Sequence, residues 1–180
     1  MTNSFLNRQE LEMIGLLGYG ENVLISRKAS FYAPGKITLG DHVRIDDFCI
    51  LSGDITIGSH VHISAYSALY GQCGVIMEDY TGLSPRCIVF SAMDDFSGEY
   101  LVGPMVDEGK RNLTGGPVLI KKYSQICAGS IVFPGIVVGE GAVVGAMSMV
   151  NRNLKAWTIY AGIPVKEIKV RHTIPETTNG

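Results

Sequence analysis

The fold of this chain is decided by residues 39–69, which read LGDHVRIDDFCILSGDITIGSHVHISAYSAL. Every sixth residue in this stretch is aliphatic, and the residue two positions before it is compact or branched. An interval of six fits neither an amphipathic helix nor a strand with alternating faces. The sixth residues are Leu39, Ile45, Leu51, Ile57, Ile63 and Leu69, and those two positions earlier include Val43, Cys49, Ile55, Val61 and Ser67.

The same interval continues in two later series. These are Met77, Leu83 and Val89, followed by Ile120, Ile126, Val132, Val138, Val144 and Val150. Short fixed periods mark solenoids, and hexapeptide repeats are typical of a parallel β-helix. We therefore predict an all-β solenoid in which each hexad forms one short strand and three hexads close a triangular coil. Neighbouring coils then stack about 4.8 Å apart, with the aliphatic side chains filling the axis.

The parts of this single domain follow from where the period holds. We predict an N-terminal helical cap over residues 1–19, early coils over 20–90 with a widened corner at 71–74, a projecting loop over 91–116, late coils over 117–152, and a C-terminal tail or short helix over 153–180. In the cap, Ser4 is the expected helix N-cap, and Phe5, Leu6, Met13 and Leu17 are expected to cover the first coil. The loop is too apolar for a disordered linker, so we expect it to be ordered against a neighbouring subunit.

Composition excludes several classes of function. The chain has 15 basic and 17 acidic residues, and its net charge of −2 argues against nucleic acid as a partner. Its four cysteines have no CxxC spacing, which favours buried free thiols over a disulfide framework or a zinc site. Because no charged-then-apolar leader opens the chain, we expect a cytoplasmic protein.

One stretch has the composition of a membrane span. Residues 126–150 carry a single charge, Glu140. Their glycines and Pro134 suit the corners of a coil rather than a helix, and their branched residues keep the period of six. We therefore predict no membrane insertion.

Three motifs resemble one protein family. Residues 75–86 (VIMEDYTGLSPR) follow the hexad phrasing that precedes the acceptor site in galactoside and related sugar acetyltransferases. Residues 126–150 are similar to the acyl-CoA-binding coils of these enzymes, and residues 161–166 (AGIPVK) to their closing Ala-Gly-x-Pro-Ala-Lys. Residues 20–171 thus resemble the hexapeptide-repeat acyltransferases. This resemblance implies a left-handed parallel β-helix, a homotrimer with active sites between subunits, and acetyl-CoA as co-substrate.

The resemblance also implies a catalytic residue. The sugar acetyltransferases carry a histidine at the end of the coil before the loop, and Asp94 occupies that position here. An aspartate is a weak base for a hydroxyl but can accept the proton that an attacking amine sheds. We therefore expect Asp94 to be the proton acceptor, with a slight preference for an amino acceptor over a hydroxyl. The alternative is that Asp94 and Asp95 are solvated loop carboxylates.

For acetyl-CoA, the resemblance implies contacts with the late coils. The pantetheine chain is expected to bind backbone amides of Ala128, Gly145 and Ala146, with Ser148 nearby, and the nucleotide phosphates are expected to meet Arg152 and Lys166. Ser148 also fills a compact inward position of its hexad, so a structural role is the alternative for it.

The expected function is direct transfer of an acetyl group from acetyl-CoA to an amino or hydroxyl group of a sugar. The acceptor would be a nucleotide-linked amino sugar or a precursor of a surface polysaccharide such as lipopolysaccharide O-antigen or capsule. One alternative is a zinc protein like the γ-class carbonic anhydrases, because His42, His60 and Glu78 are expected to share one edge. His60 and His62 do not have the ligand spacing of that class, so we expect no metal. The other alternative is a non-catalytic trimeric scaffold.

Overall fold

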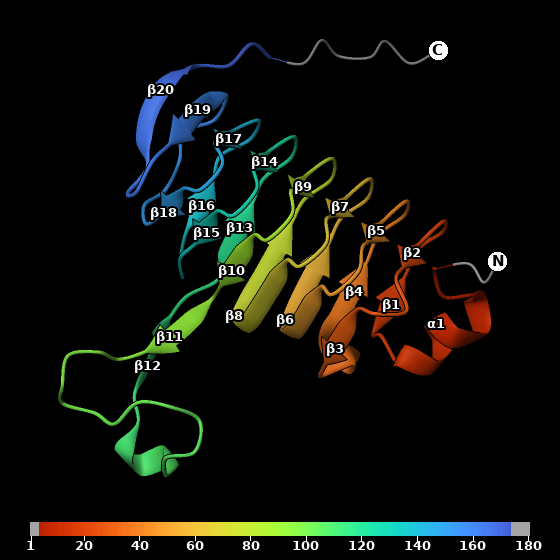
Figure 1. Ribbon diagram of the computed structural model, residues 1–180, viewed down its shortest axis with the longest axis horizontal. Helices are drawn as coiled ribbons and strands as arrows, with labels where there is room; N and C mark the ends of the chain where they lie inside the picture. The colour runs from red at the N-terminus through yellow and green to blue at the C-terminus, as the bar shows by residue number, and fades with distance from the viewer. Residues whose placement is uncertain (1–3, 174–180) are drawn as a thin grey trace.

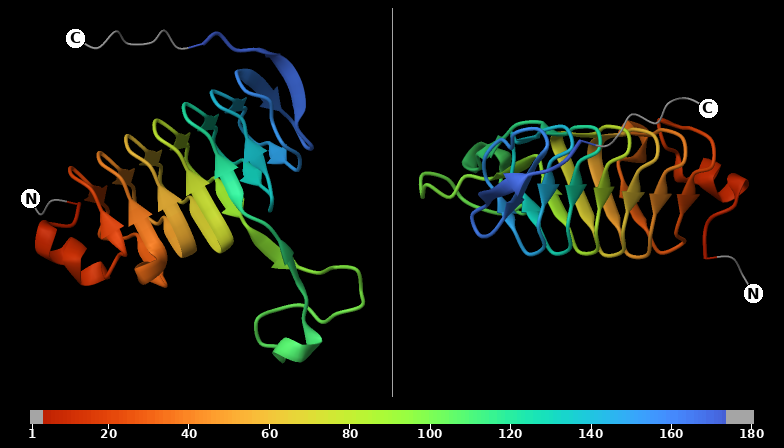
Figure 2. Two further views of the ribbon diagram at one scale, coloured as in Figure 1. Left: turned by 180° about the vertical axis from the view of Figure 1, so that it is seen from behind. Right: turned by 90° about the horizontal axis from the view of Figure 1, so that it is seen from above.

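The computed structural model describes residues 4–173, which form a parallel β-helix with three faces (Figure 1). The coils stack along the longest axis of the molecule, from helix α1 (Arg8–Ile14) at one end to strand β20 (Lys166–Val170) at the other. A hairpin leaves the solenoid between the early and the late coils. Seen from above, successive coils repeat one outline (Figure 2). The β-solenoid predicted from the six-residue period is therefore confirmed.

Each face is a ladder of strands taken from successive coils. The first face consists of β1 (Gly18–Tyr19), β4 (Ile37–Leu39), the second half of β6 (Ile50–Ile57), the second half of β8 (Ala68–Met77), β13 (Val118–Ile120) and β16 (Val137–Val138). The second face consists of β2 (Leu24–Ile25), β5 (Arg44–Ile45), β7 (His62–Ile63), β9 (Gly82–Leu83), β14 (Gln125–Ile126), β17 (Val143–Val144), β19 (Thr158–Ala161) and β20. The third face consists of β3 (Ser30–Tyr32), the first halves of β6 and β8, β10 (Ile88–Phe90), β15 (Ile131–Val132) and β18 (Met149–Val150). A short 3₁₀ turn, η1 (Pro34–Lys36), precedes β4.

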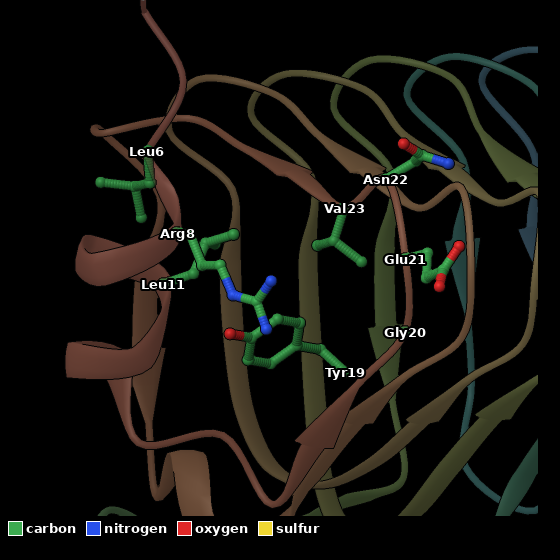
Figure 3. A pocket seen from close by; sticks show the side chains of 8 residues that line it. All are labelled: Leu6, Arg8, Leu11, Tyr19, Gly20, Glu21, Asn22 and Val23. Atoms are coloured by element: carbon green, nitrogen blue, oxygen red, sulfur yellow. The ribbon is translucent and has the colours of Figure 1, made fainter.

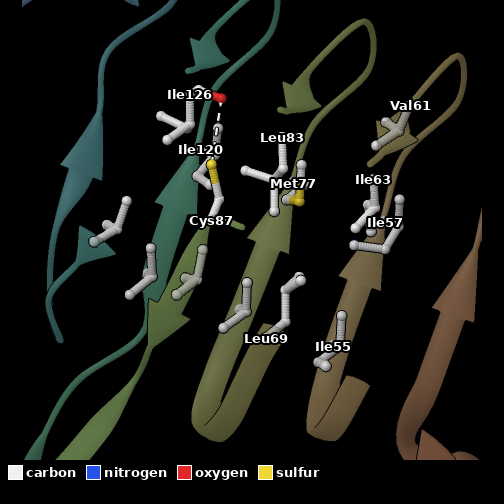
Figure 4. Close-up of a cluster of buried hydrophobic side chains, with 14 of the residues drawn as sticks. Ile55, Ile57, Val61, Ile63, Leu69, Met77, Leu83, Cys87, Ile120 and Ile126 are labelled. Atoms are coloured by element: carbon white, nitrogen blue, oxygen red, sulfur yellow. Dashed lines mark hydrogen bonds between the residues drawn. The ribbon is translucent and has the colours of Figure 1, made fainter. Parts of the chain in front are cut away.

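The core is one column of side chains along the axis (Figure 4). Ile63, Leu69 and Met77 are each completely buried, and Ile57 and Leu83 are 1% exposed. Burying one such side chain contributes about 1.5–3 kcal/mol. The compact positions of the hexads, such as Cys49 and Ser67, are buried in the same column, so both positions predicted to point inward do so.

In most coils, the first and second corners each turn through one residue in the left-handed region. On the first corner, between the first and second faces, these residues are Asn22, His42, His60, Tyr80, Tyr123, Gly141 and Trp157. On the second corner, between the second and third faces, they are Phe48, Tyr66, Arg86, Gly129 and Met147. For residues other than glycine this conformation costs roughly 1–2 kcal/mol, so contacts between coils must offset it.

The third corner is widened at residues 71–74. Strand β8 runs through it without a break, and the ladder between β6 and β8 shifts register between Gly53 and Ile55. Ile55 consequently pairs with Val75, 20 residues further on, whereas Gly53 pairs with a residue 18 further on. The widened corner expected at this point is confirmed, and it moves the later columns by two residues.

The N-terminal cap is shorter than predicted. Helix α1 begins after Asn7, whose side chain accepts a hydrogen bond from the Glu10 amide while the Glu10 carboxylate accepts one from the Asn7 amide. This capping box places the N-cap at Asn7, so the assignment of Ser4 was wrong. Leu11 is the helix residue that is buried, whereas Met13 is 83% exposed and does not cover the first coil as expected. Leu17, beyond the helix, is likewise exposed.

The C-terminal segment also differs from the prediction. Strand β19 extends the second face, because Tyr160 pairs with Val144 and is buried. Strand β20 then folds back antiparallel to β19. The solenoid therefore continues past residue 152, and strands β19 and β20 lie where a tail or short helix was expected. Residues 174–180 lie outside the described part of the chain.

The apolar stretch 126–150 forms the short strands β14 to β18 of the late coils, as predicted. Within residues 4–173, no helix has the length and apolar character that crossing a bilayer requires.

The four cysteines are free thiols in different surroundings. Burial raises the pKa of the Cys49 and Cys87 thiols to about 11, whereas Cys73 is exposed. Because the thiolate is the reactive form, we predict that iodoacetamide at pH 8 alkylates Cys73 rapidly and leaves Cys49 and Cys87 unmodified. Mass spectrometry of tryptic peptides measures this, and denatured protein, in which every cysteine reacts, is the control. Labelling of Cys49 as fast as Cys73 would contradict the buried column.

Candidate active site

The second corner leaves one backbone amide unpaired on each late coil. At this corner the left-handed residue donates its amide hydrogen to the preceding coil, as Met147 does to the Ala128 carbonyl at 2.8 Å. The residue just before the left-handed one has no such partner. Within the described residues, the amides of Ala128 and Ala146 make no hydrogen bond. Two free donors therefore lie on successive coils at the same edge of the solenoid.

Gly145 does not offer a third free amide. Its N–H donates to the Tyr160 carbonyl at 2.7 Å, and its carbonyl accepts the Ser130 hydroxyl at 3.0 Å. A Cβ at this position would lie 2.9 Å from the Ala161 Cβ. Packing between coils accounts for this glycine, and the amide contact that the resemblance implied for it is not available.

Ser148 is held inside the solenoid. It is 2% exposed, and its Oγ accepts a hydrogen bond from the Gly162 amide at 2.9 Å. Its own amide donates to the Ser130 Oγ at 3.2 Å. These contacts favour the structural role considered as the alternative for Ser148 over contact with a ligand.

The two basic residues expected near the nucleotide phosphates lie close together. Arg152 is exposed and donates one hydrogen bond from Nη2 to the Val165 carbonyl at 2.8 Å. Lys166 follows Val165 directly and is exposed as well. The remaining donors of Arg152 and the ammonium of Lys166 form a basic pair beside the late coils.

The segment 91–116 forms an ordered hairpin that projects from the body (Figure 1). Strands β11 (Ala92–Asp94) and β12 (Leu113–Gly115) pair antiparallel, and the 3₁₀ turn η2 (Glu108–Lys110) lies near the tip. Ser91 fixes the root of the hairpin. It is fully buried, its Oγ accepts the Cys73 amide at 2.8 Å, and its carbonyl accepts the Gly116 amide at 2.9 Å.

Asp94 lies at the end of β11 and is paired with an arginine across the hairpin. Its Oδ1 is 3.2 Å from Nη2 of Arg111, and the two side chains are 21% and 19% exposed. The Arg111 Nε is buried and has no hydrogen-bond partner among the described residues. Asp95 faces elsewhere, because its carboxylate accepts hydrogen bonds from Ser97 and Asn112. These bonds lower the pKa of Asp95. Asp94 is therefore not a freely solvated loop carboxylate.

Ser84, which no sequence pattern singled out, lies on the second corner between the free amides and the early coils. Its amide donates to the Ile126 carbonyl at 2.9 Å and its carbonyl accepts the Ser67 hydroxyl at 3.1 Å. Its own hydroxyl has no partner within the described residues. In one chain, Ser84 and Asp94 are separated by strand β10, which crosses the whole third face. They therefore lie at opposite edges of that face.

A charged cluster lies on the second face of the early coils. Asp46 accepts Arg44 Nε at 2.7 Å through Oδ1, and its Oδ2 is 2.7 Å from His62 Nε2. Burial opposes the charge of Asp46, but the hydrogen bonds from Arg44 and His62 outweigh it and hold the pKa of Asp46 below its ordinary value. The sequence alone assigned no functional role to His62 or Asp46.

The remaining histidines lie on the first corner in a stack of rings. His42 and His60 stack with ring centroids 4.7 Å apart, which confirms the column expected from their spacing of 18. Tyr80, rather than Glu78, continues it at 4.7 Å, because the widened corner shifts the column by two residues. Tyr123 and Trp157 extend the stack. Within residues 4–173, no group of three or more histidine, cysteine or acidic side chains is placed to hold a metal ion.

One hollow lies at the capped end of the solenoid, between α1 and the first coil (Figure 3). It has a volume of 650 Å³, and its lining includes Leu11, Tyr19 and Val23. This hollow is far along the axis from Ser84 and the late coils. It lies where helix α1 covers the end of the core.

Known proteins with related sequences are acyltransferases, and one matched over most of both chains acts on a nucleotide-linked sugar. No protein-family model matches the chain. It is 40% identical over 171 residues to dTDP-4-amino-4,6-dideoxy-D-glucose acyltransferase of Escherichia coli, which covers 93% of this chain and 89% of that protein. It is 54% identical to AntD, an N-acyltransferase from Bacillus cereus solved with dTDP and 3-hydroxybutyryl-CoA, with a TM-score of 0.92 and coverage of 95% and 92% of the two chains. A hexapeptide-repeat acetyltransferase from Vibrio cholerae, solved with acetyl coenzyme A, is 18% identical with a TM-score of 0.61 over 92% and 77%, and supports the fold alone.

Variants of AntD have also been solved with its ligands. One, S84C, holds dTDP-4-amino-4,6-dideoxyglucose and coenzyme A, and another, D94N, holds dTDP and coenzyme A. The present chain has serine and aspartate at its own positions 84 and 94.

The Asp46 cluster makes a prediction about acid stability. The lowered pKa means that the charged carboxylate stabilises the fold above the ordinary value of 3.8, and that this contribution is lost as the pH falls through the folded-state pKa. We expect Asp46→Asn to melt at a lower temperature than the wild type at pH 5, with the difference shrinking towards pH 3. Calorimetry measures it. Asp54→Asn is the matched control, because the exposed Asp54 carboxylate has no partner within the described residues. A difference that does not change with pH would contradict the assignment.

Proposed function

This chain belongs to the hexapeptide-repeat acyltransferases, and we propose that it transfers an acyl group from a coenzyme A thioester to the amino group of a nucleotide-linked amino sugar. The observation that carries the proposal is the match, over almost the whole chain, to two acyltransferases whose names or ligands specify a dTDP-linked aminosugar. We further propose dTDP-4-amino-4,6-dideoxyglucose as the acceptor. The acyl group is acetyl or a short homologue such as 3-hydroxybutyryl, the donor found in AntD.

The reaction requires little from the protein beyond positioning and a proton acceptor. The amine nitrogen attacks the thioester carbon, a carbon–nitrogen bond forms, and the carbon–sulfur bond breaks. The cationic intermediate gives one amine proton to the acceptor carboxylate, and the coenzyme A sulfur departs as a thiolate that takes up one proton to become the free thiol. We assign proton acceptance to Asp94. Its carboxylate is held by Arg111 at the root of a well-ordered hairpin, and its second oxygen makes no hydrogen bond within the described residues.

The second corner of the late coils would bind the acyl donor. The free amides of Ala128 and Ala146 are hydrogen-bond donors for the pantetheine carbonyls, and the spacing of successive coils places them roughly 4.8 Å apart along the axis. Arg152 and Lys166 would contact the phosphates of coenzyme A, because planar guanidinium and ammonium groups are their natural partners. Ser84 lies beyond Ala128 on the same corner, where the thioester end of the pantetheine chain would reach.

We propose a homotrimer in which each active site lies between two subunits. Within one chain, Ser84 and Asp94 lie at opposite edges of the third face, so one subunit would supply the corner and its neighbour the hairpin. The hairpin presents exposed apolar side chains that a neighbour would cover. These are Phe96, Tyr100, Leu101, Val102, Met105 and Leu113. Free thiols on all four cysteines are consistent with a cytoplasmic enzyme.

An acyl-transfer assay tests the function. Purified protein is incubated with acetyl-CoA or 3-hydroxybutyryl-CoA and dTDP-4-amino-4,6-dideoxyglucose, and free thiol release is followed. We predict turnover with the amino sugar and none with the 4-hydroxy analogue. Asp94→Asn should lower kcat/KM by at least about tenfold, since general bases contribute about 10²- to 10⁴-fold. Asp95→Asn is the control in the same hairpin and should retain activity. Wild-type turnover by Asp94→Asn would remove Asp94 from the mechanism.

A second test concerns the free amides. Pro85 occupies, one coil earlier, the corner position that Ala128 and Ala146 occupy on the late coils, so the corner accepts proline there. Ala146→Pro removes one N–H donor without a required change of backbone. A hydrogen bond is worth about 0.5–1.5 kcal/mol, so we expect coenzyme A to bind about two- to tenfold more weakly by calorimetric titration. Ala65→Pro, at the same position on an early coil, is the control. Unchanged affinity in Ala146→Pro would exclude this amide from the site, and absence of coenzyme A binding in the wild type would favour a scaffold.

A further inference from the structure

Two pairs of polar side chains cross the projecting hairpin next to each other, and each joins residues 17 apart in the sequence. Asp94 meets Arg111 at 3.2 Å, and Asp95 accepts a hydrogen bond from Nδ2 of Asn112 at 2.8 Å. Leu113 lies directly opposite Asp94 in the ladder of β11 and β12, so Arg111 is a diagonal neighbour of Asp94 on the opposite segment. The two pairs therefore connect the same two segments at the same level of the hairpin.

The Asp95 pair is sufficient to hold these segments together. The Asp95 amide donates to the Asn112 carbonyl at 2.9 Å, in addition to the bond between the two side chains. The Asp95 carboxylate also accepts the Ser97 amide at 2.8 Å. All of these donors are neutral, and the pair leaves no buried polar atom unpaired within the described residues. The hairpin thus has a structural cross-link that does not involve Asp94.

The Asp94 pair is a more costly way to join the same segments. Both of its side chains are about four-fifths buried, so two charged groups lose most of their water. Within residues 4–173, Nε of Arg111 is also the one buried side-chain nitrogen or oxygen that has no hydrogen-bond partner. Native structures rarely leave such an atom unpaired, and a functional role is one of the reasons for the exceptions. Because the Asp95 pair already joins the segments, we look to Asp94 itself for the reason that Arg111 is there.

The backbone of Arg111 is fixed independently of its contact with Asp94. Arg111 follows the 3₁₀ turn η2, and its amide donates to the Glu108 carbonyl at 3.2 Å. Leu101 forms a parallel bridge with Arg111, in which the Leu101 amide donates to the Lys110 carbonyl at 2.9 Å. The guanidinium is planar and rigid, so a fixed backbone and a largely buried side chain also fix the direction of its N–H groups. Arg111 can therefore hold one carboxylate oxygen in a defined place.

We propose that Arg111 is a positioning residue for acyl transfer, which holds Oδ1 of Asp94 so that Oδ2 faces the attacking amine. Oδ1 stays hydrogen-bonded to Nη2 of Arg111. Oδ2, which has no partner within the described residues, takes the proton that the cationic intermediate gives up and becomes the O–H of a carboxylic acid. The proton then passes to water, which restores the carboxylate. This inference rests on the proposed function, because it takes Asp94 to be the proton acceptor.

The rate of transfer depends on this contact because the carboxylate would otherwise rotate about its Cβ–Cγ bond. A misplacement of about 1 Å at a reacting group can lower a rate about 10²-fold. Arg111 acts in this scheme only through Asp94 and touches neither the thioester nor the amine. Its removal should therefore lower kcat without weakening the binding of coenzyme A.

Steady-state kinetics of the full chain, with the coenzyme A thioester and the amino sugar nucleotide, test the proposal. Arg111→Met keeps an unbranched side chain and removes every donor. We expect its kcat to fall by about tenfold or more, while calorimetric titration shows wild-type affinity for coenzyme A. Arg111→Lys retains one charged donor and should recover part of the lost kcat. In an Asp94→Asn background, Arg111→Met should cause no further loss, because the effects of residues that act through one group are not additive.

The neighbouring pair supplies a matched control. Asn112→Ala breaks the other cross-link between the same segments, so it should lower the melting temperature and leave kcat unchanged. Lys110→Gln removes an exposed cation that pairs with Asp107, next to Arg111 in the chain, and should change neither quantity. Melting temperatures establish that each variant is folded at the assay temperature. Should Arg111→Met not fold, Arg111→Lys carries the test: its kcat should fall below that of the wild type, but not in the Asp94→Asn background.

Three results would overturn the proposal. Arg111 is not a positioning residue if Arg111→Met turns over as fast as the wild type, or if Asn112→Ala lowers kcat as much. It is also excluded if Arg111→Met costs the same factor with and without the Asp94 carboxylate, since Arg111 would then act on the substrate or on the fold. Failure of the proposed function looks different, because the wild type itself would then transfer no acyl group to the amino sugar. Loss of activity in Asp94→Asn together with full activity in Arg111→Met keeps that function and removes only this inference.

Discussion

The structure depends on how the backbone turns at each corner of the coil. A triangular coil with three short strands per turn places a residue with positive φ at most of its first and second corners, and most of these residues are not glycine. Each costs roughly 1–2 kcal/mol in isolation. The cost is offset by a ladder in which the left-handed residue donates its amide to the preceding coil, as His60 does to Asp41 and Tyr80 does to Ser59. Stacked rings add to this on the first corner, and Gly141 leaves the space into which the Trp157 indole packs.

The two corners differ in the side chains that cover them. On the second corner, the residue before each left-handed one keeps a free amide on the late coils and presents open side chains on the early coils. On the first corner, rings cover the edge, and Arg171 binds the carbonyls of Tyr123 and Gly141 at 3.0 and 2.9 Å. One edge of the solenoid is therefore a closed structural column, and we propose that the other edge binds the donor. In this account, function follows from the geometry of the coil and needs few specialised residues.

Much of the fold followed from the sequence because the six-residue period is strict where nothing is inserted. It predicted the buried column and the stacking of His42 on His60. The prediction failed where the number of residues per coil departs from 18. The widened corner at 71–74 adds two residues, so Tyr80 and not Glu78 stacks on His60. Tyr160 lies only 16 residues after its partner Val144, so the last coil was not predicted.

The site was less accessible to prediction. The resemblance pointed to Asp94, but its partner Arg111 lies 17 residues away across a hairpin with no periodic signal. A sequence motif likewise does not reveal that the Gly145 amide donates a hydrogen bond to the next coil while the Ala146 amide makes none. The position of Ser84 could have been predicted from the period. Like Asp46 and Ser64, it directly follows a strand of the second face and donates its amide to the next coil.

Hydrogen–deuterium exchange of the full chain, with and without coenzyme A, tests most directly whether the second corner of the late coils binds the donor. We predict that coenzyme A slows exchange in peptides covering residues 127–130 and 145–148. Exchange around His60 and Tyr123 on the first corner should not change. Protection confined to the first corner, or no protection of the late coils, would contradict this assignment.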